Sequence, residues 1–236
     1  MEGAATELAA VAVEKQGDEM SADQRMYKFL TPQRKGGYSS YRWPEIGVWT
    51  HRIPDSESLR ICQVGYHVLT SDQLLGSYMQ AELYEVEWAG DILRDNEKCA
   101  VRQAKLIRKI ETWNDWTVRI FAADCAERAL PIFERQYPDD KRPRACIQAT
   151  RDFAEGKITA QKLGAAAAGA ADAAWAAGAA GAAWAAGAAG AAAARAAAAG
   201  AAGAAAAAAG AAAAGAAGAA EKKWQIEHLK EMLGIS

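Results

Sequence analysis

At the segment Trp113–Glu134, WNDWTVRIFAADCAERALPIFE, the sequence changes from patterns typical of β-strands to a pattern typical of α-helices. Its apolar residues recur at spacings of three and four, a pattern that predicts an amphipathic α-helix. Asn114 stands at the start of this pattern and has the side chain of a good helix N-cap. Pro131 is expected to kink the helix or end it early, because proline lacks a backbone donor and its ring clashes with the preceding turn.

Three further helices are predicted on the C-terminal side of this segment. Pro138–Pro143 reads as a turn, and the helix after it should stop near Gly156. Thr159 is placed to cap the next helix, which runs into an unusual stretch. The tail Glu221–Leu233 is amphipathic, and Gly234 suits its C-terminal cap.

The stretch from Gly164 to Ala220 contains 42 alanines and 11 glycines among its 57 residues. Its composition favours α-helix, because alanine has the highest helix propensity. The interruptions fall at every third residue from Asp172 to Gly190, a period that drifts around a helix with 3.6 residues per turn. We therefore expect an array of helices that is contacted on several sides, with no single apolar stripe.

The N-terminal half predicts a small domain rich in β-structure. Alternating or β-branched runs indicate strands at 27–30, 58–68, 81–92 and 99–110, with a turn at Gly90-Asp91. The predicted domains are a frayed tail at 1–25, a β-rich domain at 26–112 and a helical domain at 113–236 that includes the array at 164–220. The predicted fold class is α+β, a small mostly-β domain followed by an all-α, Ala/Gly-rich helical array.

The bulk composition limits the classes of function. The net charge of −2 does not indicate an obligatory nucleic-acid partner. The four cysteines form no CxxC pair and the N-terminus lacks a secretory pattern, so reduced thiols and a cytoplasmic location are expected. The Ala/Gly stretch contains Asp172 and Arg195 and lacks larger aliphatic side chains, which argues against a membrane span.

Two segments resemble known families. Phe121–Glu134, followed by Tyr137–Arg144 with its Asp-Lys-Arg-Pro-Arg turn and then by Ala-rich helices, resembles the immunity proteins of bacterial polymorphic toxin systems over about residues 113–233. This resemblance implies an all-helical array and a protein partner. The N-terminal part resembles an uncharacterised domain of bacterial and phage proteins, through Tyr27–Leu30, Cys62-x-x-Gly65-Tyr-His67 and Leu83–Gly90, together with Lys98.

The sequence offers few candidates for chemistry. Cys62 and His67 are the one close Cys/His pair, and a nucleophile–base contact between them would need the chain to reverse at Gly65. Glu87 is a further candidate catalytic residue, and no metal or cofactor motif is present. A basic run could touch phosphates, although nearby Glu82, Glu85 and Glu87 should offset it. The run consists of Lys98, Arg102, Lys105, Arg108 and Lys109.

The function predicted from these observations is non-enzymatic binding of a protein partner, as in an immunity or antitoxin-like module. The candidate binding residues are Trp175, Trp184 and Arg195 in the array and Arg142 and Arg144 in the turn before it. The alternative is an enzyme that acts on a nucleotide or protein through the N-terminal domain. A second alternative is a self-assembling or ice-binding Ala/Gly surface.

Overall fold

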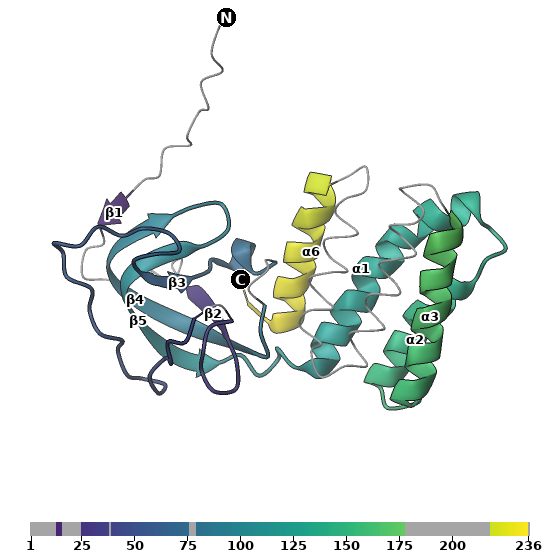
Figure 1. The fold of residues 1–236 in the computed structure, drawn as a ribbon, viewed down its shortest axis with the longest axis horizontal. Coiled ribbons are helices and arrows are strands. Elements are labelled where there is room, and N and C mark those ends of the chain that lie inside the picture. Colours follow the sequence, from purple (N-terminus) through teal and green to yellow (C-terminus); the bar gives the residue numbers. More distant parts are fainter. Residues whose placement is uncertain (1–12, 16–24, 38, 76–78, 178–217, 236) are drawn as a thin grey trace, which may run out of the picture. The chain divides into compact units, whose positions relative to one another are not determined.

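The computed structural model describes residues 13–15, 25–37, 39–75, 79–177 and 218–235 (Figure 1). The chain divides into two compact units, each made of several stretches of sequence. The first unit contains Met1–Lys28, Trp43–Gln73 and Tyr84–Arg108, and the second contains Phe29–Arg42, Leu74–Leu83 and Lys109–Ser236. The domain boundaries expected from composition remain predictions.

The described strands form one sheet. Its strands are β1 (Val13–Lys15), β2 (Met26–Leu30), β3 (Tyr66–Val68), β4 (Glu82–Arg94) and β5 (Cys99–Lys109). The order is β1-β4-β5-β3, with β2 also paired to β4. The turn between the two long strands is held by Asp95, whose Oδ1 accepts the backbone N–H groups of Glu97 and Lys98 at 2.7 and 2.8 Å.

The alternation predicted for β4 is confirmed. Leu83, Val86 and Trp88 are buried, whereas the glutamates between them are only partly covered. The turn predicted at Gly90-Asp91 is wrong, because the strand continues through it to Arg94. Gly90 has φ +84°, and a Cβ there would lie 2.9 Å from a guanidinium nitrogen of Arg52. This glycine therefore admits a close side chain within the strand and does not end it.

The strand predicted at 58–68 is much shorter in the structure. Only Tyr66–Val68 is a strand, and it pairs antiparallel with β5 so that His67 lies opposite Ala100. The preceding residues form tight turns, in which Cys62 adopts φ +64° and Val64 both donates to and accepts from the backbone of Arg60. Such left-handed backbone is incompatible with a continuous strand.

Helix α1, Asp115–Gln136, begins where the sequence predicts. The side chain of Asn114 accepts the backbone N–H groups of Trp116 and Thr117 at 3.0 and 3.1 Å. The expectation that Pro131 ends the helix early is wrong, since α1 continues to Gln136. Pro131 is exposed, so water can reach the carbonyl group that its missing N–H leaves unbonded.

The other described helices also begin and end close to their predicted signals. Helix α2 is Arg142–Ala154, helix α3 is Ala160–Ala177 and helix α6 is Gly218–Leu233. Thr159 Oγ1 accepts the N–H of Lys162 at the start of α3. Gly156 follows the C-cap residue of α2 with φ +73°, and Gly234 directly follows α6 with φ +66°, as expected of glycines at the C-terminal ends of helices.

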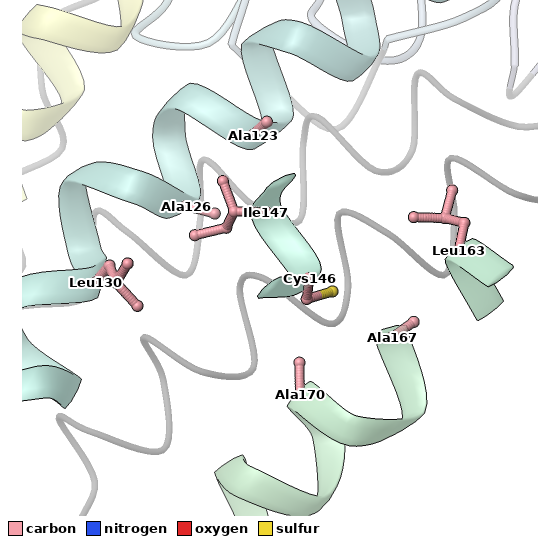
Figure 2. Packing of buried hydrophobic residues seen from close by; sticks show 8 residues of the cluster. All are labelled: Ala123, Ala126, Leu130, Cys146, Ile147, Leu163, Ala167 and Ala170. Carbon is pink, nitrogen blue, oxygen red and sulfur yellow. The ribbon is translucent and has the colours of Figure 1, made fainter. Parts of the chain in front are cut away.

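Residues of three helices form the core of the helical part. Helix α2 packs against α1 and α3, while α6 packs against α1 (Figure 1). Figure 2 shows the buried cluster that joins the first three helices. Its members are Ala123, Ala126 and Leu130 of α1, Cys146 and Ile147 of α2, and Leu163, Ala167 and Ala170 of α3.

The predicted fold class is wrong in its helical half. The described helices do not form an Ala/Gly-rich all-α array; the chain is mixed, a curled antiparallel sheet followed by α1, α2, α3 and α6. Most of the core side chains come from outside the Ala/Gly stretch. The physical reason is that an alanine buries one methyl group, so larger residues such as Leu130 and Ile147 must supply most of the apolar area.

Multi-sided packing is also absent from the described start of the Ala/Gly stretch. The buried residues of α3 form one stripe, and the alanines between them are exposed apart from Ala166, which is partly buried against the same core. The stripe consists of Leu163, Ala167, Ala170 and Ala173. Its spacings of four, three and three begin before the period-three pattern, which starts at Asp172. No helix in the described part of the chain is long and apolar enough to cross a membrane.

Candidate partner-binding face

Asp124 on α1 joins three helices through one carboxylate. Its Oδ1 accepts a hydrogen bond from the guanidinium group of Arg151 on α2 at 2.7 Å. Its Oδ2 lies 2.8 Å from Nε2 of His228 on α6, which donates to it. Arg151 also donates to Glu127, one turn further along α1, at 2.7 Å. The side chains of Asp124, Arg151 and His228 are each 22–24% exposed, so this network is partly screened from water.

Aromatic rings extend the network along α6. The ring of His228 stacks on that of Trp224 with centroids 4.7 Å apart. The guanidinium group of Arg128 lies 4.1 Å from the Trp224 ring centroid and donates to both carboxylate oxygens of Glu221 at 2.9 and 3.2 Å. A cation over an indole face is a favourable arrangement. We call this connected surface of α6, α1 and α2 the charged face; it comprises Asp124, Glu127, Arg128, Arg151, Glu221, Trp224 and His228.

An open groove of about 400 Å3 lies between α1 and α2, next to the charged face. Leu130 and Ile147, which are 1% and 3% exposed, form its apolar base. Charged side chains stand around it. They are Glu127 of α1 together with Lys141, Arg144 and Arg151 of the turn and α2. Such a combination of apolar base and charged rim can accept a side chain of a partner.

The two arginines predicted for binding point to different neighbours. Arg144 donates twice to Glu134 of α1, each time at 2.7 Å, and lines the groove. These hydrogen bonds hold the pKa of Glu134 below its usual value. Arg142 donates to Asp140, and its side chain passes 3.9 Å from where a Cβ on Gly169 of α3 would lie. Only Arg144 therefore belongs to the groove.

A family model described as Imm-5 like putative immunity protein matches residues 108–232, which is more than half of the chain. The chain belongs to this family. The match runs from the end of β5 through α6, so it contains every residue of the charged face and of the groove. Searches of curated proteins and of solved structures returned no match.

The remaining binding candidates lie beyond what the structure describes. Trp184 and Arg195 fall outside the described residues, and Trp175 lies in α3 at a position whose side chain is not described. Their part in binding therefore stays a prediction. The same holds for the self-assembling or ice-binding surface, because most of the Ala/Gly stretch is outside the described residues.

Cys62 and His67 come together, but not as a thiol and its base. Nε2 of His67 accepts the backbone N–H of Cys62 at 2.9 Å, so the ring nitrogen that could act as a base is occupied. Burial, followed by the charges of Lys28 and Lys98, lowers the pKa of His67 to about 4. This favours the neutral ring that the hydrogen bond requires. The contact closes the turn before β3.

The basic run of β5 is offset by acids across the sheet, as predicted. Arg102 donates to Asp91 at 2.8 Å, and Lys105 lies 2.6 Å from Glu87. Two further pairs, Arg108 with Glu85 at 2.7 Å and Lys109 with Glu82 at 2.9 Å, continue the ladder. Glu87 is thus engaged in a cross-strand ion pair. Binding of nucleic acid remains a prediction that these pairs do not favour.

The sequence reasoning missed the centre of the charged face. No local pattern pairs Asp124 with His228, because 104 residues separate the two. A histidine four residues after Trp224 on an amphipathic helix was the available signal.

The three cysteines of the interior, Cys99, Cys125 and Cys146, are buried free thiols, and burial raises the pKa of Cys146 to about 12. No metal-binding group of three or more His, Cys, Asp or Glu occurs among the described side chains.

Proposed function

We propose that the chain is a non-enzymatic immunity module that binds a protein toxin through the charged face and so protects the cell that makes both proteins. The observation that carries this proposal is the coincidence of the family match at 108–232 with the helices that build the face. Its expected place of action is the cytoplasm.

The chemistry of the face suits a protein partner. Arginine and tryptophan are the side chains that most often dominate protein interfaces, and here Arg128 lies over Trp224. Glu127 and Arg128 have side chains 48% and 43% exposed, so a partner can reach both charges. The ion pairs hold these groups in fixed positions before binding, which lowers the entropy cost of association.

We expect the gene of the toxin to lie beside the gene of this chain, and the test is protection from that toxin. Co-expression of the full chain should restore growth, and the purified proteins should form a complex. Glu127→Lys should reduce complex affinity at least tenfold, since it reverses an accessible charge of the face. The matched control is Glu155→Lys, which reverses an exposed charge after the end of α2. If the wild-type chain does not restore growth, the proposal is refuted. If the two variants reduce complex affinity equally, the toxin does not bind through the charged face.

A further inference from the structure

The groove between α1 and α2 has an uneven distribution of charge. Among its lining side chains, Lys141, Arg144 and Arg151 are basic and Glu127 is acidic. Arg151 stands at one end and is already held by two carboxylates, those of Asp124 and Glu127. The opposite end, at Lys141 and Arg144, has Glu134 as the acid bonded to Arg144, while Lys141 donates to the backbone carbonyl group of Pro138.

The start of α2 adds to this positive end. The first turn of α2 contains no acidic residue, and Lys141 occupies the N-cap position without a side-chain cap. The carboxylate of Asp140, one residue earlier, accepts the backbone N–H of Arg142 at 3.1 Å and pairs with the guanidinium group of that residue, so it does not neutralise Lys141. The N-terminus of a helix carries a partial positive charge, so basic side chains there are unfavourably placed for helix stability. The groove thus joins a basic end to an apolar base formed by Leu130 and Ile147.

We propose that this groove binds an acidic segment of the partner protein. An apolar side chain of the segment lies on Leu130 and Ile147, and a neighbouring carboxylate pairs with Lys141 at the basic end. The volume of about 400 Å3 is within the usual range for a binding pocket, roughly 300–1,000 Å3. This inference rests on the proposed function and specifies the chemistry of the partner.

The test uses peptide probes with the full chain, so it does not require the toxin. Fluorescein-labelled peptides of identical length carry two leucines flanked by glutamate, by glutamine or by lysine, and their affinities are measured by fluorescence anisotropy. The glutamate peptide should bind at least tenfold more tightly than the lysine peptide. Shifts of the amide signals of Gln148 and Ala145 in NMR spectra of the labelled chain should locate it in the groove.

Matched variants separate the groove from general electrostatic attraction. Lys141→Glu should weaken the glutamate peptide at least tenfold, and it should not unfold α2, because an acid suits a helix N-terminus. Arg135→Glu, an exposed charge of α1 that does not line the groove, should change affinity less than twofold. Lys141→Gln should have an intermediate effect.

Three results would overturn the inference. They are tighter binding of the lysine peptide, equal effects of Lys141→Glu and Arg135→Glu, and no binding of any probe at millimolar concentration. Protection from the toxin that persists in Lys141→Glu would leave the proposed function standing and reject the groove alone. If the wild-type chain gives no protection but binds the glutamate peptide selectively, the proposed function is rejected and the binding preference of the groove stands.

Discussion

At the scale of single residues, Asp124 is the acceptor on which two neighbouring helices depend. Asp124→Asn keeps the shape of the side chain but removes the charge that faces Arg151 and His228. We expect a loss of about 1–3 kcal/mol in the free energy of unfolding, between the values for exposed and buried ion pairs. Unfolding in urea measures this difference in the free energy of unfolding between the variant and the wild-type chain.

The control for Asp124 is Asp139→Asn, which makes the same change at an exposed position in the turn before α2. It should shift the free energy of unfolding by less than about 0.5 kcal/mol. If both variants lose the same amount, Asp124 does not join the helices in the way its hydrogen bonds indicate.

His67 should make stability depend on pH. Its pKa in the folded chain is about 4, against 6.5 ordinarily, because of burial and the nearby lysines. Between these values the unfolded chain binds a proton that the folded chain does not, so stability is lost as pH falls from about 6.5 to 4. His67→Gln should flatten this part of the profile in thermal melts.

The control for His67 is His51→Gln, at an exposed histidine of the same unit. Its pH profile should follow that of the wild-type chain. A wild-type profile as steep as that of His67→Gln would contradict the lowered pKa. The sequence showed that Cys62 and His67 were close, but it could not show which atoms meet, because that depends on the turns before β3.

At the scale of elements, α3 tests whether the Ala/Gly stretch packs on one side. Ala170 is fully buried in the cluster shown in Figure 2, whereas Ala171 is exposed. Ala170→Leu should lower the free energy of unfolding by about 1–3 kcal/mol, because the added carbons have no space. Ala171→Leu should change it by less than about 0.5 kcal/mol.

Equal losses in these two variants would instead support contact on several sides of α3. Chemical denaturation of both proteins, followed by circular dichroism, gives the comparison. The same signal reports helix content, so a local loss of helix at the substituted position can be separated from global unfolding.

Element positions were predictable where a local signal decides them. Asn114, Thr159 and Gly234 mark helix ends through their own backbone or side-chain bonds, and the structure confirms all three. Local preference failed at Gly90, where the strand continues, and at Pro131, where the exposed position lets water reach the carbonyl group left without a donor. The side chain of Arg52 approaches Gly90 from another part of the chain, and no local pattern reports such an approach.

At the scale of the whole molecule, the second unit depends on stretches that precede the family match. Trp113 is 2% exposed, its Nε1 donates to the carbonyl group of Gln80 at 2.9 Å, and its ring lies 5.1 Å from that of Phe29. A fragment that begins at residue 109 lacks both partners. It should therefore unfold at lower urea concentration than the full chain, as followed by circular dichroism at 222 nm.

Trp113→Ala in the full chain should reproduce much of that loss, at about 3–5 kcal/mol for a buried tryptophan. Trp116→Ala is the comparison, since that residue is 50% exposed on the first turn of α1. A fragment as stable as the full chain would show that residues 29–42 and 74–83 contribute nothing to the helical part. The match to a helical family could be foreseen from the turn at 140–144, but this dependence on residues before it could not.

The hydroxyl group of Thr112 donates to the carbonyl group of Leu233 at 2.8 Å, across 121 positions of sequence. Thr112 lies four residues after the start of the family match and Leu233 one residue after its end, so the stretch between them begins and ends at one hydrogen bond. A segment whose two ends lie close together can be inserted into a surface loop of a host protein without moving the ends of that loop apart. The same geometry would allow a short linker to join Leu233 to Thr112, with new termini between α2 and α3. The resulting circular permutant of residues 112–233 lacks Phe29 and Gln80, so it should be less stable than the full chain.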